Sequence, residues 1–163
     1  MKSSIYIETT IPSYLTAWPS RDLIRAAHQQ ITRDWWTARD RFVLYTSRMV
    51  IEECGAGDPR AAADRLAAMA DISLLETTPD TAELVEKLLR GVPLPARASA
   101  DTLHIAIAAV QGIEYLLTWN CTHIANAILR PRIEAVCREA GCEPPMICTP
   151  TVLLPGGQTD DRG

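Results

Sequence analysis

The stretch from Ser99 to Asn126 constrains the fold of this chain more than any other segment. Asp101 opens a run of Ala, Ile, Leu and Val that is apolar nearly all round, as expected for a helix buried on every side. Gly112 ends this run, and residues 115–118 then have the pattern of a short buried strand. A buried helix that leads directly into a buried strand is typical of an α/β domain.

The rest of the chain repeats this alternation of strand-like and helical segments. The segments that we expect to be strands are 5–7, 42–46, 72–75, 115–118 and 144–149. Such alternation predicts a three-layer α/β/α fold with a central, mostly parallel sheet. A chain of 163 residues is most simply one domain. We assign residues 1–154 to that domain and expect a disordered tail over 155–163.

Capping residues predict where the helices start. The expected N-caps are Ser20, Ser47, Asp58 and Thr78, and the last two are each followed by proline. After Asn120 we expect a short helical segment, and Pro131 can open a last helix that ends at Gly141.

Composition and the first residues exclude several classes of protein. The formal net charge of −4 and the pI near 5.4 argue against a broadly basic nucleic-acid binder, although a local patch can still bind phosphates. No apolar run approaches the roughly 20 residues that a bilayer span needs. Residues 1–4 lead straight into a strand without the long apolar region of a signal peptide. We therefore expect a soluble, cytoplasmic protein with no membrane partner.

The five cysteines do not form a recognisable structural pattern. Their number is odd and they contain no Cys-x-x-Cys pair, which argues against both a disulfide framework and a zinc ribbon. We expect them to be reduced thiols packed in the core.

Three carboxylates and one amide stand out as candidates for chemistry. They are Glu8 after the first strand, Glu53 in the helix after the second strand, Asp101 in the buried helix and Asn120 after the 115–118 strand. In a parallel sheet, strand C-termini and helix N-termini share one edge, so these side chains can converge there. Clustered oxygen ligands are what Mg²⁺ or Mn²⁺ requires, which points to phosphoryl transfer or phosphodiester hydrolysis.

Each of these residues also has a structural interpretation. Asp101 can simply complement a helix N-terminus, Asn120 can cap the segment that follows it, and Glu53 can be a solvated helix residue. Asp101 and Glu53, however, lie next to strongly apolar surroundings, where a carboxylate is seldom buried without a partner or a metal. This favours the metal-site interpretation.

The histidines raise zinc as another alternative, because His104 follows Asp101 by three residues and Cys121 lies close to His123. Structural zinc sites usually draw on closely spaced ligand pairs at both ends, and this chain has only one such pair. We therefore expect His104 to be a satisfied core residue or one that orients a ligand, and Cys121 to be a packed thiol. The chain also lacks the glycine patterns of phosphate-binding loops.

The residues around the four candidate ligands form recognisable motifs. They are Ile5-Tyr6-Ile7-Glu8-Thr9-Thr10, Val50-Ile51-Glu52-Glu53, Ala100-Asp101-Thr102-Leu103-His104-Ile105-Ala106 and Leu116-Leu117-Thr118-Trp119-Asn120. Together they resemble the PIN-domain family, and most closely the VapC-like toxins of bacterial toxin–antitoxin pairs. The resemblance covers most of residues 4–150 and is most specific at 101–104 and 117–120.

The resemblance implies a metal-dependent ribonuclease that cleaves RNA with a metal-activated water. It also implies a homodimer and an antitoxin partner whose tail blocks the acidic pocket. Glu53 and Asp101 match the family's acids, whereas Glu8 and Asn120 stand where the family usually has Asp. Glu8 adds a methylene, and Asn120 removes a negative charge, which should weaken cation binding. Thr118 is also typical of the pattern and could bond a metal-bound water or a phosphate.

We therefore consider three hypotheses. The first is a Mg²⁺- or Mn²⁺-dependent endoribonuclease, a toxin with a cognate antitoxin, in which Glu8, Glu53 and Asp101 hold the metal and Asn120 holds a second metal or a water. The second is a PIN-fold module that binds RNA or a partner protein with weak or no catalysis. The third is a metal-dependent DNA nuclease.

Overall fold

The computed structural model describes residues 1–156, and its centre is a sheet of five strands. The strands are β1 (Ser4–Ile7), β2 (Val43–Ser47), β3 (Ser73–Leu75), β4 (Tyr115–Leu117) and β5 (Met146–Cys148). Their order across the sheet is β3-β2-β1-β4-β5, and every neighbouring pair is parallel. The prediction of a central parallel sheet, with the last strand at an edge, is confirmed.

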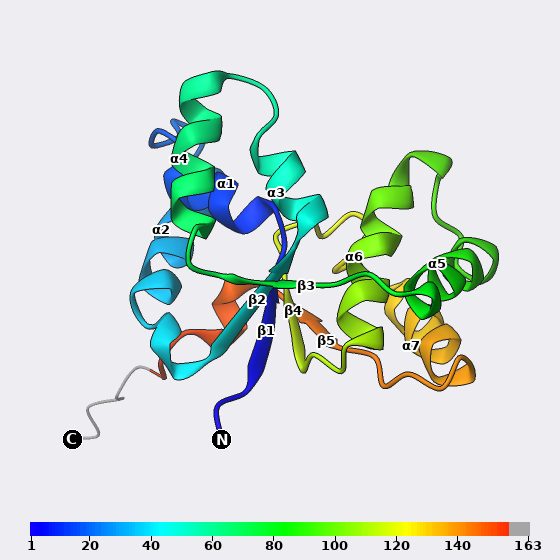
Figure 1. Ribbon diagram of the computed structural model, residues 1–163. Helices are drawn as coiled ribbons and strands as arrows, with labels where there is room; N and C mark the ends of the chain where they lie inside the picture. Colours follow the sequence, from blue (N-terminus) through cyan, green and yellow to red (C-terminus); the bar gives the residue numbers. More distant parts are fainter. Residues whose placement is uncertain (157–163) are drawn as a thin grey trace.

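Helices cover both faces of this sheet (Figure 1). They are α1 (Thr10–Thr16), α2 (Leu23–Thr37), α3 (Arg48–Cys54), α4 (Pro59–Met69), α5 (Pro79–Gly91), α6 (Ser99–Val110) and α7 (Arg130–Glu139), with short 3-10 helices at Arg39–Arg41, Ala96–Ala98 and Pro150–Leu153. Helices α1, α2 and α4 pack together on one side of the sheet, and α5, α6 and α7 on the other. The fold is therefore the expected three-layer α/β/α arrangement.

Helix α6 is buried nearly all round, as its composition predicts. Residues 104–109 are all buried, and Asp101 lies in the first turn of the helix. Gly112 has a φ of 69°, a left-handed conformation that favours glycine, and it turns the chain into β4. In β4, Leu116 and Leu117 are completely buried. This unit therefore forms the interior of the domain and brings Asp101 and Asn120 to one edge of the sheet.

Local side-chain bonds explain where the helix boundaries were predicted correctly and where they were not. Ser47, Asp58 and Thr78 are N-caps, as expected. Ser20 is not, because its hydroxyl accepts from the backbone N–H of Asp22, and Asp22 instead caps α2 by accepting from the N–H of Arg25. The three correct predictions share a cap directly followed by the first helical residue, whereas two residues separate Ser20 from α2.

The segment after Asn120 forms turns rather than the expected short helix. The side chain of Asn126 accepts from the backbone N–H groups of Ile128 and Leu129, and such local bonds compete with helix formation. The last helix then begins at Arg130, with Pro131 in its first turn, and is followed by Gly141 with a φ of 82°.

Two further predictions concern the cysteines and the tail. Cys54, Cys137 and Cys148 are buried, and Cys142 is partly buried, but Cys121 is exposed because it lies in a surface turn. The expectation that Cys121 is a packed thiol was therefore wrong. Of the predicted disordered tail, Pro155 and Gly156 lie in no helix or strand, and residues 157–163 lie outside the described residues. No helix within residues 1–156 has the length and apolar character needed to cross a bilayer.

Candidate active site

Glu8 directly follows β1, at the edge of the sheet where the strands end. In the sheet, Ile7 pairs with Leu117 of β4, so Glu8 and Thr118 are the next residues on two neighbouring strands. The Glu8 side chain is only 5% exposed. Its Oε2 accepts hydrogen bonds from the Thr118 hydroxyl at 2.8 Å, from the Thr10 backbone N–H at 3.0 Å and from the Thr10 hydroxyl. The carboxylate is therefore held on one oxygen by three donors.

Glu53 lies near the end of α3, the helix that follows β2. Its Oε1 accepts from the Thr9 hydroxyl at 2.7 Å and lies 2.9 Å from His104 Nε2. Burial by itself would raise the pKa of Glu53, but the hydrogen bonds from His104 and Thr9 bring that pKa below its ordinary value. Glu53 is therefore held in its ionised form. It lies near Glu8, because Thr9, which donates to Glu53, is the residue that follows Glu8 in the chain.

His104 connects Glu53 to the interior of the domain. The ring is 1% exposed, and its Nδ1 lies 2.7 Å from the hydroxyl of Tyr6 on β1. The Tyr6 hydroxyl in turn lies 2.7 Å from the hydroxyl of Ser47, the N-cap of α3. His104 is therefore a buried residue with both ring nitrogens satisfied, one of them on a candidate ligand.

Asp101 has a different set of partners. Its Oδ2 lies 2.7 Å from His123 Nδ1, and its Oδ1 accepts from the side-chain amide of Asn120 at 3.2 Å. The Asn120 carbonyl oxygen accepts from the backbone N–H of His123 at 3.0 Å. Asn120 therefore holds both members of the Asp101–His123 pair, and an aspartate at this position would lack the amide donor.

Thr118 joins the Glu8 and Asp101 groups. Its hydroxyl donates to Glu8 and accepts from the backbone N–H of Asn120 at 2.9 Å. The residue between them is anchored as well, since Trp119 donates its backbone N–H to the Thr10 hydroxyl and its indole N–H to the Thr32 hydroxyl, both at 2.8 Å. A continuous set of hydrogen bonds thus leads from Glu8 through Thr118 and Asn120 to Asp101.

The predicted residues thus fall into three pairs at one edge of the sheet: Glu8 with Thr118, Glu53 with His104, and Asp101 with Asn120. Sequence reasoning missed Thr9, Thr10 and Tyr6, and it weighed His123 only as a zinc ligand. The position of Thr9 and Thr10 directly after Glu8 is a signal that could have found them. Tyr6 lies between Ile5 and Ile7 in a buried strand, and no local pattern separates its role from theirs.

The metal that the sequence motifs suggest is Mg²⁺ or Mn²⁺. The donors are carboxylate oxygens, the type that Mg²⁺ and Mn²⁺ prefer. Within residues 1–156, Glu8 Oε1 and Glu53 Oε2 accept no hydrogen bond, so each keeps an oxygen for another partner, whereas both oxygens of Asp101 are engaged. The described residues contain no group of three or more His, Cys, Asp or Glu side chains gathered closely enough to hold an ion. The side chains therefore match Mg²⁺ or Mn²⁺ in the type of donor atom, but they are not gathered into a cluster around an ion.

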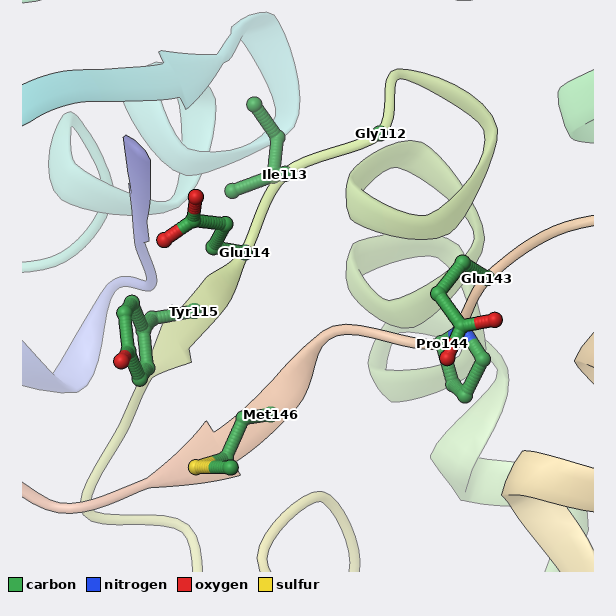
Figure 2. Close-up of a pocket in the computed structure, with 7 residues that line it drawn as sticks. All are labelled: Gly112, Ile113, Glu114, Tyr115, Glu143, Pro144 and Met146. Atoms are coloured by element: carbon green, nitrogen blue, oxygen red, sulfur yellow. The ribbon is translucent and has the colours of Figure 1, made fainter. Parts of the chain in front are cut away.

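A hollow lies at the opposite end of the strands and plays no part in this site. It lies at the beginning of β4 and β5 (Figure 2). Its volume is about 320 Å³. Its lining residues are Gly112, Ile113, Glu114, Tyr115, Glu143, Pro144 and Met146. Because β1, β4 and β5 run parallel, these residues are separated by the length of the strands from Glu8 and Thr118.

We also compared the chain with models of protein families and with curated proteins, and neither comparison found a match. A functional assignment therefore depends on the side chains at the carboxyl edge of the sheet.

Proposed function

We propose that this chain is a metal-dependent endoribonuclease of the PIN/VapC type that hydrolyses RNA phosphodiester bonds. The observation that carries the proposal is that Glu8, Glu53 and Asp101 all lie at the carboxyl edge of a parallel sheet. Glu8 is joined to Asp101 through Thr118 and Asn120, and Glu53 is bonded to Thr9, the residue after Glu8. The three acids come from three separate segments, and each is held by polar side chains. Ligand sites of open α/β sheets are commonly found at this edge.

In this proposal Glu8, Glu53 and Asp101 hold Mg²⁺ or Mn²⁺, and Asn120 contributes a carbonyl oxygen or orients a water. The bound cation would supply an activated water and neutralise charge on the phosphodiester. The two threonines at Glu8 and the histidine at Glu53 keep one oxygen of each carboxylate occupied, so that the other oxygen has a defined direction. Thr118 and His104 are thus supporting residues.

The same proposal includes the biological setting of the enzyme. The protein acts in the cytoplasm as a toxin, forms a homodimer and is inhibited by a cognate antitoxin. Light scattering after gel filtration is expected to give twice the chain mass of 17.9 kDa. A monodisperse monomer across micromolar concentrations would contradict the dimer.

The sharpest test uses two neighbouring glutamates on α3. Glu53→Gln removes a charge from the site, whereas Glu52→Gln removes the same charge from an exposed position beside it. We expect wild type and Glu52→Gln to bind Mn²⁺ in calorimetry and to cleave a structured RNA. Glu53→Gln should bind Mn²⁺ at least about tenfold more weakly and cleave correspondingly less. Equal binding and cleavage by both variants would contradict the site.

The pairing of Asp101 favours a second candidate function. Both oxygens of this carboxylate are already engaged, by His123 and by the amide of Asn120. A carboxylate whose two oxygens are both hydrogen-bonded within the protein fits a module that binds RNA or a partner protein, with weak or no catalysis. In that case the wild type would bind RNA without Mn²⁺ and would not cleave it at saturating Mn²⁺.

A further inference from the structure

Tyr6 and Ser47 are buried polar residues that the proposed reaction does not use. The side chains of Tyr6, Ser47 and His104 are at most 1% exposed. Polar groups in such surroundings destabilise a fold unless every one is hydrogen-bonded. Here all three are joined in one series of hydrogen bonds that ends on Glu53. Glu53, a candidate metal ligand, is the one residue of the four whose side chain reaches the surface.

Counting donors and acceptors gives this series a direction. The ionised carboxylate of Glu53 can only accept, so His104 Nε2 carries the hydrogen of their 2.9 Å bond. The backbone N–H of Val50 donates to the Ser47 oxygen at 3.3 Å. If Ser47 donates to Tyr6 and Tyr6 donates to His104 Nδ1, every hydroxyl hydrogen is used. In the reverse arrangement the Ser47 hydrogen has no acceptor within the described residues.

The position of the Tyr6 hydroxyl supports the same direction. A phenol hydroxyl both donates and accepts, so the Tyr6 hydroxyl can accept from Ser47 and donate to His104 Nδ1 at the same time. The series also closes on itself, because Ser47 caps the start of α3 and Glu53 lies on the same helix. The Tyr6 hydroxyl on β1 is therefore linked by hydrogen bonds both to the N-cap of α3, Ser47, and, through His104, to Glu53 near the end of that helix.

We propose that Tyr6 is a positioning residue for Glu53. Its hydroxyl holds His104 as the tautomer that carries hydrogen on Nε2 and directs that N–H to Glu53 Oε1, so that Oε2 is the oxygen available to a cation. The inference rests on the proposed metal-dependent function for its consequence in catalysis. The tautomer and orientation of His104 do not depend on any metal.

The variant Tyr6→Phe tests this role because it removes the hydroxyl and keeps the ring that fills the core. A matched control is Tyr45→Phe, since Tyr45 pairs with Tyr6 in the sheet and its hydroxyl makes no hydrogen bond within residues 1–156. In full-length protein without metal, ring ¹⁵N chemical shifts of His104 report its tautomer. We expect the Nε2–H pattern in wild type and Tyr45→Phe, and a mixture of tautomers in Tyr6→Phe.

The consequence at the acid is measured with Mn²⁺ alone and then with RNA. Loss of a residue that orients a metal ligand typically weakens metal binding 10- to 100-fold, so a Kd increase of about that size is expected for Tyr6→Phe. In cleavage at subsaturating Mn²⁺, kcat should fall while KM for RNA is unchanged. Tyr45→Phe should match wild type in both measurements, which separates the effect from a general loss of stability.

The outcomes distinguish this inference from the proposed function. Unchanged His104 shifts and unchanged Mn²⁺ affinity in Tyr6→Phe would overturn the positioning role. If Tyr6→Phe fails to fold, the wild-type spectrum still decides, because an Nδ1–H tautomer of His104 there would contradict the proposal. If wild type neither binds Mn²⁺ nor cleaves RNA, the proposed function fails, and the His104 shifts in the two variants still test the role of Tyr6.

Discussion

Two histidine–carboxylate pairs lie in the candidate site, and they differ in how their histidines are held. His104 and Glu53 are 2.9 Å apart, and His123 and Asp101 are 2.7 Å apart. The His104 side chain is 1% exposed and its second nitrogen is bonded to Tyr6. The His123 side chain is 16% exposed, and its Nε2 makes no hydrogen bond within the described residues.

The difference shows that similar contacts at a site can have different origins. His104 belongs to a regular buried helix and is held from β1, so its partner is determined by the packing of the core. His123 belongs to a segment of turns and is held chiefly through Asn120. We therefore expect the Glu53 pair to be rigid and to support the fold, and the Asp101 pair to be exchangeable when a cation or substrate arrives.

The largest expected effect is that of Asp101→Asn on the exchangeable pair. Without this carboxylate, Mn²⁺ binding should be lost and RNA cleavage should fall by at least about 100-fold, more than the loss of an orienting residue alone would cause. Because Asp101 is paired with His123 and Asn120 rather than with the other acids, we expect no gain in stability. The control is Asp80→Asn, which alters an exposed first-turn acid of α5. Nuclease activity equal to wild type would refute the assignment of Asp101.

Thiol reactivity measures the difference in exposure, because each pair has a cysteine beside it. Burial raises the pKa of Cys54, next to Glu53, to about 11, so only about one molecule in 1,000 carries the thiolate at pH 8. Cys121, next to Asn120, is exposed. We expect iodoacetamide to modify Cys121 at least about 100-fold faster, as followed by peptide mass spectrometry. Comparable rates at the two cysteines would show that the Glu53 side of the site opens as readily as the other.

Replacing each histidine tests which pair supports the fold. His104→Ala leaves a cavity and a Tyr6 hydroxyl with Ser47 as its remaining partner, so we expect it to lower the free energy of unfolding by about 2–4 kcal/mol. His123→Ala removes a partly exposed partner, and its cost should stay below about 1 kcal/mol. Both values come from urea denaturation without metal. Equal costs would mean that the two pairs do not differ in their role in the fold.

Asn120→Asp tests why the exchangeable pair has an amide at this position. An added carboxylate should tighten Mn²⁺ binding, by about tenfold in a partly desolvated site. The variant also loses the donor to Asp101, so without metal it should unfold more easily, by about 1 kcal/mol. Calorimetry and RNA cleavage at saturating Mn²⁺ are compared with wild type.

Two results of this comparison are informative. Faster cleavage by Asn120→Asp would indicate a nuclease weakened by its amide, whereas tighter binding with equal or slower cleavage would indicate that the amide orients a water. Metal affinity equal to wild type would place Asn120 outside the site, as a residue that only holds Asp101 and His123.

The smallest expected effect is the pH dependence that Glu53 adds to stability. Its folded-state pKa lies below the ordinary value of 4.5, so its contribution is complete above the unfolded-state pKa and is lost as the pH falls through the folded-state pKa. Glu53→Gln should therefore be less stable than wild type at pH 7, by less than about 1 kcal/mol because the side chain is partly exposed. The difference should shrink below about pH 4.5. A difference that stays constant down to pH 3 would contradict the shift.

Much of the fold could be predicted because each decisive signal is local. Gly112 after an apolar helix, the capping residues Ser47 and Asp58, and the alternation of segments all act within a few residues. The failures were also local: Ser20 was expected to be the cap, but the cap is Asp22, two residues later. Cys121 was expected to be a packed thiol, as free cysteines usually are, but β4 ends at Leu117 and Cys121 lies in the turn that follows.

The sequence by itself determined the sheet and the edge at which the acids lie. Strands that alternate with helices run parallel, and a carboxylate that follows a strand or opens a helix then lies at one edge. Only the tertiary structure decided the partners of each acid. His104 and Glu53 are 51 residues apart, and Tyr6 and His104 are 98 residues apart, so their contact depends on which strands become neighbours and in what register. The spacing of residues along the chain does not encode those distances, because they arise from the packing of α3, α6 and β1 against one another.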